Sequence, residues 1–199
     1  MEVIINDTGI PSWPIGILAL IVVLVILWRQ KKKWSYLFFF SIFWVYAMSS
    51  LDKVFFPIQI NGEFVDAMRQ IPLNSQINLV PFYFGPYGMN FMGMFYNILL
   101  TVPFGFGLNF IVRVKVMHFL WLAVAIGIGI EAIQFVISLL LQYPYRVVDI
   151  NDAILNAAGV LVGYLLFKVF SWLYVGVTKR FEIDHSGLSS YVYEVVSQS

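Results

Sequence analysis

The stretch RVVDINDAILNAAGVLVG, residues 146–163, decides the fold because it joins a charged start to a long apolar segment. Its polar residues at regular spacing are Arg146, Asp149, Asp152 and Asn156. An apolar helix of about 20 residues crosses a bilayer, and ionisable groups in such a helix face a bundle interior or a water-filled cavity. The stretch therefore predicts a transmembrane helix whose first turns carry functional groups.

The rest of the chain has the composition of an integral membrane protein. Of its 199 residues, 60% are apolar and only 12% are charged, and the mean hydropathy is +0.83. A soluble domain carries about 25% charged residues. The net charge of +1 provides no basic surface for nucleic acid, and the lack of cysteine excludes disulfides and thiolate chemistry. We expect one membrane domain over residues 1–199, with loops too short for a separate soluble core.

Five apolar segments predict an all-α fold, a polytopic membrane helical bundle with five transmembrane helices. The segments cover residues 13–28, 34–56, 90–112, 116–141 and 153–177. Each of the four segments after the first is long enough to cross about 30 Å of hydrocarbon at 1.5 Å per residue. The first segment is followed by basic residues, the reverse of the order in a signal peptide, so we expect it to remain as an anchor.

Basic residues gather in short blocks between the apolar segments, and these blocks predict the orientation. They are Arg29 with residues 31–33, Arg113 with Lys115, and Lys179 with Arg180. In a five-span chain the blocks lie on one side of the membrane, which the positive-inside rule makes the cytoplasmic side. The prediction is N-out and C-in, with residues 180–199 as a flexible cytoplasmic tail.

The segment between the second and third predicted spans, residues 57–89, is rich in proline, glycine, asparagine and aromatic residues. Phe64, Met68 and Ile71 recur at helical spacing, which is typical of a short interfacial helix. Aromatic side chains prefer the membrane interface to water. We therefore expect an interfacial or re-entrant segment on the outer side.

The predicted topology brings polar side chains near the third, fourth and fifth spans into the same outer leaflet. These residues are Asn97, Glu131, Gln134, Arg146, Asp149, Asp152 and Asn156. Polar and ionisable groups are costly within a bilayer, so such a cluster indicates a functional site.

Structural roles are open for every member of this cluster. Glu131 and Arg146 could form an ion pair, which would remove much of the cost of burying Glu131. Asp149 and Asp152 could serve as residues that start the fifth helix. The three carboxamides could form interhelical hydrogen bonds worth about 0.6 kcal/mol each. One ion pair and one helix cap do not account for the whole cluster, so we favour a site.

Small residues predict close helix packing beside this cluster. Gly159 and Gly163 form a GxxxG pair on the fifth span, and Ala123 and Gly127 form a similar step on the fourth. Small residues at this spacing let the backbones of two membrane helices approach each other. We expect the fourth and fifth spans to pack through these residues.

Four motifs, in this order and spacing, resemble the signature of the VanZ family. They are NLVPF at residues 78–82, NILLTVPFGF at 97–106, EAIQ at 131–134 and RVVDINDAILNAAG at 146–159. The resemblance covers about residues 78–167. It implies a multi-pass protein of the bacterial cytoplasmic membrane, related to the family member that lowers susceptibility to teicoplanin-type lipoglycopeptide antibiotics.

The favoured function, which follows from this resemblance, is to lower susceptibility to such antibiotics by binding an envelope lipid or a lipid-linked cell-wall precursor in a pocket that faces outward. All seven cluster residues are candidate ligand contacts, and Arg146 would bind a phosphate or carboxylate. Two alternatives stay open. One is an intramembrane enzyme with Glu131, Asp149 and Asp152 as catalytic candidates; no cofactor is predicted, although carboxylate oxygens could bind a divalent cation. The other is a protein that binds a membrane partner through the glycines of the fifth span.

Overall fold

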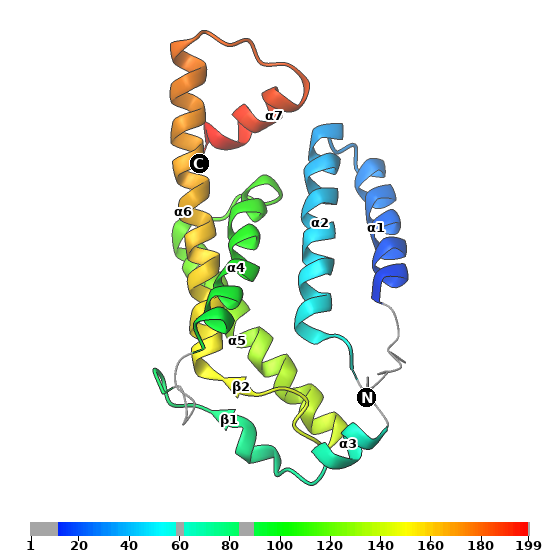
Figure 1. Cartoon of the computed structure of the whole chain (residues 1–199). Coiled ribbons are helices and arrows are strands. Elements are labelled where there is room, and N and C mark those ends of the chain that lie inside the picture. Colours follow the sequence, from blue (N-terminus) through cyan, green and yellow to red (C-terminus); the bar gives the residue numbers. More distant parts are fainter. Residues whose placement is uncertain (1–11, 59–61, 84–89, 199) are drawn as a thin grey trace, which may run out of the picture.

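The computed structural model describes residues 12–58, 62–83 and 90–198, and these residues are mainly helical (Figure 1). The α-helices are α1 (Ser12–Arg29), α2 (Trp34–Phe55), α3 (Glu63–Met68), α4 (Phe91–Gly107), α5 (Val116–Leu141), α6 (Ile150–Arg180) and α7 (Gly187–Val196). Two 3-10 helices, η1 (Leu73–Gln76) and η2 (Leu108–Phe110), and two short strands, β1 (Ile77–Asn78) and β2 (Val148–Asp149), complete the described elements. The all-helical class predicted from the sequence is confirmed, apart from this single strand pair.

Four of the described helices are long and apolar enough to cross a membrane: α2, α4 continued by η2, α5 and α6. They correspond to the second to fifth predicted spans. The first predicted span corresponds to α1, which is apolar but shorter. Four spanning helices are therefore supported by length and composition, and the fifth stays a prediction.

The core of the bundle is α6, which packs against α4 on one side and α5 on the other. Gly105 of α4 and Gly163 of α6 allow backbone contact between these two helices, because a Cβ atom on either would overlap a carbonyl of the other helix. On the other side, a Cβ atom on Gly127 of α5 would overlap the Ala153 carbonyl of α6. The predicted packing of the fourth and fifth spans is confirmed at Gly127.

The glycine pair of α6 packs against α4, so the prediction that it packs against the fourth predicted span, α5, is wrong. Gly159 and Gly163 both face α4 and are buried, with Thr101 and Val102 as the α4 neighbours. This face is covered by the chain's own third span. It does not offer the free surface that the partner-binding alternative required.

The α1–α2 hairpin stands beside this core (Figure 1). Within the hairpin, the Trp44 indole donates a hydrogen bond to the Gly16 carbonyl at 3.0 Å. Towards the core, the Tyr46 hydroxyl of α2 donates to the Leu100 carbonyl of α4 at 2.6 Å. The contact of α2 with α4 is much less extensive than that of α6 with α4. The α2 helix therefore forms a wall that is separated from the core along part of its length.

The chain between α2 and α4 contains the short helix that the sequence predicts, formed here by α3. This helix fully buries Val65, whereas Phe64, which the helical spacing placed on the apolar face, is 57% exposed. After η1, strand β1 pairs in parallel with β2, so that Asn78 lies opposite Asp149. Residues 59–61 and 84–89 of the predicted interfacial or re-entrant segment lie outside the described residues.

The residues after Arg180 correct another expectation, because part of the predicted flexible tail is the helix α7. Val196 is buried with Phe110 and Phe167, so α7 is packed against η2 and α6. The Lys33 ammonium donates a hydrogen bond to Glu194 at 2.6 Å, and this bond lowers the pKa of the Glu194 carboxyl. The apolar periodicity of a ten-residue helix is easily hidden by polar neighbours, so the sequence pattern alone does not predict α7.

Candidate ligand-binding cavity

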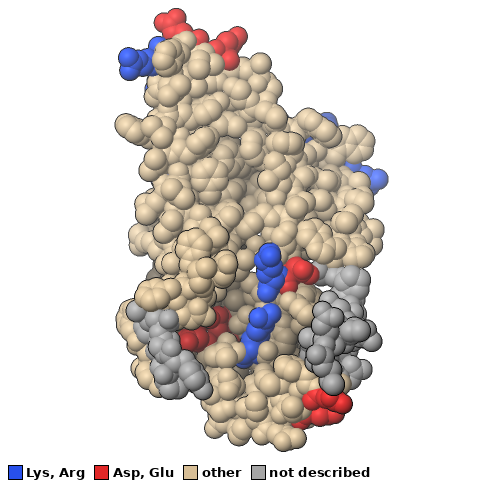
Figure 2. Space-filling model, in the orientation of Figure 1, with Lys and Arg blue, Asp and Glu red and all other residues tan. Residues whose placement is uncertain are grey.

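A cavity of about 970 Å³ lies between α2 and the α4–α5–α6 core. Its volume is in the range of about 300–1,000 Å³ that is usual for small-molecule sites. Its lining residues are Tyr46, Ser49, Ser50, Lys53, Val54, Tyr96, Asn97, Leu99, Leu100, Ile130, Glu131, Gln134, Arg146, Val147, Asp152 and Asn156. Figure 2 shows charged side chains of both signs in the lower half of one face, separated by a mostly uncharged band from further charged side chains at the upper end and upper right edge.

Six of the seven predicted site residues line this cavity. Asn97 comes from α4, Glu131 and Gln134 come from α5, Arg146 precedes β2, and Asp152 and Asn156 lie in the first two turns of α6. The helices bring them together because α4 and α5 both contact α6 through glycine backbones, as described above. The seventh residue, Asp149, is not among the residues that line the cavity.

Asp149 instead starts helix α6, which is the structural role that the sequence left open for it. Its carboxylate accepts a hydrogen bond from the Asn151 backbone N–H at 2.8 Å, as an N-cap does. The same oxygen accepts from the Asn78 side chain at 3.0 Å. Its own backbone N–H donates to the Glu131 carboxylate at 3.0 Å. Asp149 therefore positions Glu131 and joins β1 to the start of α6.

Asn151 extends this structural network, and the sequence analysis missed it. Its side-chain oxygen accepts from the Phe82 backbone N–H at 2.6 Å, and its side-chain nitrogen donates to the Tyr83 carbonyl at 2.9 Å. Asn78 donates to the same Tyr83 carbonyl at 2.9 Å. The two asparagines thus fasten the loop after β1 onto the start of α6. Their membership of two of the quoted motifs was the signal that could have indicated a shared role.

The possible ion pair between Glu131 and Arg146 is absent among the described residues. Glu131 is only 7% exposed and accepts its hydrogen bond from the Asp149 backbone. Arg146 lies over the ring of Tyr145, with the guanidinium carbon 5.5 Å from the ring centre. Both charges therefore face the cavity without neutralising each other.

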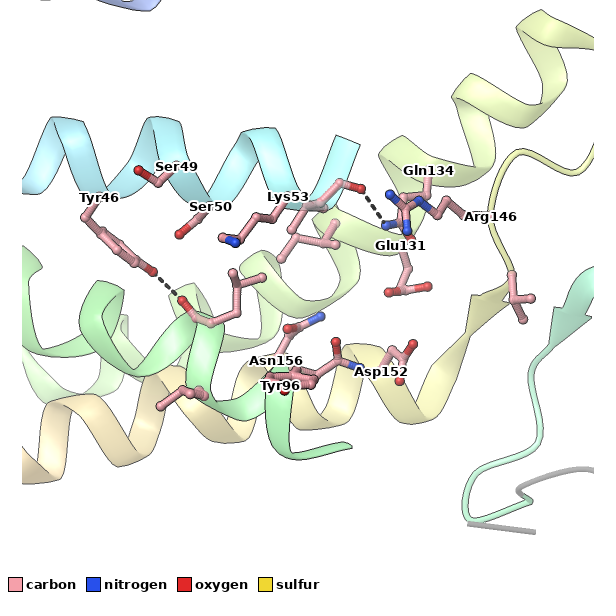
Figure 3. A pocket seen from close by; sticks show the side chains of 16 residues that line it. Tyr46, Ser49, Ser50, Lys53, Tyr96, Glu131, Gln134, Arg146, Asp152 and Asn156 are labelled. Carbon is pink, nitrogen blue, oxygen red and sulfur yellow. Dashed lines mark hydrogen bonds between the residues drawn. The ribbon is translucent and has the colours of Figure 1, made fainter. Parts of the chain in front are cut away.

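Glu131 and Asp152 are directed towards the same part of the cavity from α5 and α6 (Figure 3). Glu131 interacts electrostatically with Asp152, and Asn97 is a hydrogen-bond partner of the Asp152 carboxylate. Two carboxylates of like charge in a partly desolvated site repel each other. The arrangement favours a cationic group or a hydrogen-bond donor between them.

Asn156 carries a buried side-chain oxygen without a partner on the cavity wall. The side chain lies one turn after Asp152 and the residue is only 2% exposed. Its Oδ1 atom has no hydrogen-bond partner among the described residues. A buried acceptor that lacks a donor costs about 1–3 kcal/mol. Occupation of the cavity by a donor would remove this cost.

The α2 wall of the cavity was missed by the sequence analysis. It contributes Tyr46, Ser49, Ser50 and Lys53, which lie at helical spacing i, i+3, i+4 and i+7 within an apolar segment. This polar stripe was the available signal, because such a spacing places all four on one face. Lys53 extends from α2 into the cavity in Figure 3, and Gln134 of α5 donates to the α2 backbone at Val54.

These features fit a membrane protein with a charged cavity between helices that are long and apolar enough to cross a bilayer. A sequence model of the VanZ/LLP1 family matches residues 40–171, about two thirds of the chain, so the chain belongs to this family. The match includes most of α2, which lies outside residues 78–167 where the motif resemblance was seen. The α2 wall is thus part of the family region. No match was found among curated proteins or solved structures.

The divalent cation considered from the sequence stays a prediction. Among the described residues there is no group of three or more histidine and acidic side chains that could hold a metal ion. The two carboxylates that line the cavity, Glu131 and Asp152, are accompanied by carboxamides and cations rather than by further acidic ligands.

Proposed function

We propose that the cavity binds the headgroup of an envelope lipid or of a lipid-linked cell-wall precursor. The observation that carries this proposal is the buried, unpartnered Asn156 oxygen on the wall of a cavity that also contains four charged residues. Apolar residues of α2, α4 and α5 line the same cavity. Polar groups at membrane depth beside an apolar surface suit a ligand that is itself amphipathic.

We propose further that five spans cross the bacterial cytoplasmic membrane, with the amino terminus outside and the cavity open to the outer leaflet. The ion pairs of Glu194 with Lys33 and Arg113 support this orientation, because they gather the α1–α2 turn, the α4–α5 turn and α7 at one end. The cavity lies towards the other end of α2, at Lys53. The positive-inside rule then assigns the cavity to the outer side.

At the cell level we propose that ligand binding lowers susceptibility to lipoglycopeptide antibiotics of the teicoplanin type. These drugs act at the outer surface on lipid-linked wall precursors, which are present in the leaflet to which the cavity would open. The protein would alter access to that lipid or its neighbours. This proposal rests on membership of the VanZ/LLP1 family and on the orientation above.

The test compares lipid binding by the purified protein and by two cavity variants, Arg146→Ala and Asp152→Asn. We expect both variants to lose bound lipid at equal folded amounts, measured by mass spectrometry of extracted lipids. Arg69→Ala is the matched control, since Arg69 is exposed and lies outside the cavity lining. Equal lipid content in all four proteins would contradict the proposal.

The same variants test the cell phenotype in a deletion strain. With equal membrane amounts, the parent chain and Arg69→Ala should protect against teicoplanin, while Arg146→Ala and Asp152→Asn should not. Vancomycin, which lacks the lipid tail, is the comparison drug. Protection by all four chains would show that the cavity residues are not needed for protection against teicoplanin.

A catalytic role is the second candidate, favoured by the two carboxylates that face the same space in Figure 3. A pair of carboxyl groups can hold and move a proton when one is neutral. Glu131→Gln separates the two roles, because it keeps the shape and the hydrogen bond from Asp149 but removes proton transfer. Retained ligand binding with a lost phenotype would favour catalysis. Retained phenotype would argue against it.

A further inference from the structure

The four charged residues of the cavity come from four elements. The cations Lys53 and Arg146 lie on α2 and the segment before β2, while the carboxylates Glu131 and Asp152 lie on α5 and α6. This division indicates which headgroup the cavity selects. We propose that the cavity recognises a headgroup that carries both a primary ammonium and a phosphate, as in phosphatidylethanolamine. The inference deepens the proposed lipid-binding function and rests on it. It names the chemistry of the ligand, which that proposal left open.

The ammonium would lie between Glu131 of α5 and Asp152 of α6. No described cation forms an ion pair with either carboxylate. Glu131 receives its hydrogen bond from the Asp149 backbone, and Asp152 has the neutral carboxamide of Asn97 as its partner. These neutral donors leave the combined negative charge uncompensated, and an ammonium compensates it.

Asn156 makes this end of the cavity selective for an amine that has N–H groups. Its unpartnered Oδ1 atom is an acceptor and can be satisfied only by a donor. A primary ammonium has three N–H donors, one for each of Glu131, Asp152 and Asn156. A quaternary ammonium such as choline carries the same charge but has no N–H group. It would leave the Asn156 oxygen unsatisfied.

The phosphate would lie nearer to Lys53 of α2 and Arg146 of the segment before β2. Both cations line the cavity, and neither forms an ion pair among the described residues. The planar guanidinium of arginine binds two phosphate oxygens at once, and the flexible lysine acts as a point charge. The stacking of Arg146 on Tyr145 limits the directions that its guanidinium can take.

The two cations lie on different elements from the two carboxylates, so a ligand with both charges would bridge them. Lys53 reaches across from α2, opposite the α6 residues Asp152 and Asn156 (Figure 3). A purely anionic headgroup would bind the cations but meet the carboxylates with the same sign of charge. A purely cationic ligand would bind the carboxylates but would be repelled by Lys53 and Arg146. Only a zwitterionic headgroup is attracted both by the two carboxylates and by the two cations.

The experiment measures binding of four short-chain lipids to the purified full-length protein in detergent, by native mass spectrometry. The probes are dihexanoyl phosphatidylethanolamine, phosphatidylcholine, phosphatidylglycerol and phosphatidic acid. We expect phosphatidylethanolamine to bind about tenfold more tightly than the other three, the size of effect that one charge-assisted hydrogen bond produces. This comparison needs no variant, so a folding defect cannot obscure it.

Variants then test which residues bind the ammonium and which bind the phosphate. Asp152→Asn should weaken the binding of phosphatidylethanolamine, because its ammonium loses one carboxylate. The preference over phosphatidic acid should disappear, because the additional negative charge of phosphatidic acid meets less repulsion. Asn156→Leu should reduce the preference for phosphatidylethanolamine over phosphatidylcholine. Lys53→Met should weaken the binding of all four lipids, because each of them carries a phosphate. Glu63→Gln is the matched control, because Glu63 is exposed and outside the cavity lining.

The possible failures are distinguishable. Equal affinity for the ethanolamine and choline lipids, at measurable strength, would overturn the selectivity for a primary ammonium and leave lipid binding intact. Tightest binding of phosphatidic acid or phosphatidylglycerol would overturn the assignment of Glu131 and Asp152 as the site for an ammonium group. No binding of any of the four lipids, together with no lipid in the purified protein, would overturn the proposed function itself.

Discussion

Asn156 is the residue at which stability and function are expected to oppose each other. Its amide oxygen is buried without a donor, so the empty cavity bears the cost of that atom. Replacement by leucine, which is similar in size and has no polar atoms, should leave stability unchanged or raise it by about 1–3 kcal/mol. The measurement is the thermal midpoint of purified Asn156→Leu in detergent without added lipid. A lowered midpoint would mean that the amide has a stabilising partner.

Asp149 lies only three residues before Asp152, yet it is expected to behave in the opposite way. Its carboxylate caps α6 and receives hydrogen bonds from Asn78 and Asn151. Asp149→Ala should therefore lower stability by about 1–3 kcal/mol, through loss of the cap and of two side-chain partners. Chemical unfolding followed by circular dichroism measures the change. Asp66→Ala is the control, since Asp66 is exposed and its ion pair among the described residues is a 3.8 Å contact with Arg69.

At the scale of elements, the bundle depends on the backbone contact between α4 and α6. A Cβ atom at Gly163 would overlap the Val102 carbonyl, and the rigid backbone of α4 cannot move aside without separating the helices. Gly163→Ala should therefore lower the thermal midpoint and reduce the yield of folded protein. Gly176→Ala, in the same helix but with nothing within 4 Å of its Cβ position, is the matched control. It should be neutral or stabilising by up to about 1 kcal/mol. Equal effects of the two substitutions would contradict the close contact.

Helix boundaries were predictable where apolar segments end at charged or turn-forming residues. The segment 116–141 coincides with α5, and 34–56 differs from α2 by one residue. The helix that packs against a face of small residues was not predictable, because the spacing of Gly159 and Gly163 indicates close backbone contact but does not identify the neighbouring helix. Helix α7 was missed because its apolar residues occupy less than three turns among polar neighbours.

The site was predictable as a group of polar residues at one depth, but the division of roles within it was not. Asp149 and Asp152 share a helix start, and periodicity cannot show that one caps the helix while the other faces a cavity. Lys53 lies near the end of a predicted span, where a solvated lysine is the usual explanation. Its role depends on how α2 stands against α4 and α5, a tertiary arrangement that no single segment encodes.

For the whole molecule, orientation decides whether the cavity can affect antibiotics that act outside the cell. The chain has no cysteine, so single cysteines report topology directly. We expect Glu2→Cys, ahead of α1, and Ser75→Cys, in η1 at the cavity end, to react in intact cells with a maleimide that cannot cross the membrane. Glu182→Cys, between α6 and α7, should react only after the membrane is opened.

The three positions together separate the possible arrangements. Reaction at Ser75→Cys with protection of Glu2→Cys would mean that α1 does not cross, which leaves four spans and an unchanged cavity orientation. Protection of Ser75→Cys with reaction of Glu182→Cys would invert the molecule. The cavity would then open to the cytoplasmic leaflet, where lipid-linked precursors are made rather than where lipoglycopeptides bind. Lipid selectivity could survive that result, but the proposed link to these antibiotics at the outer surface could not.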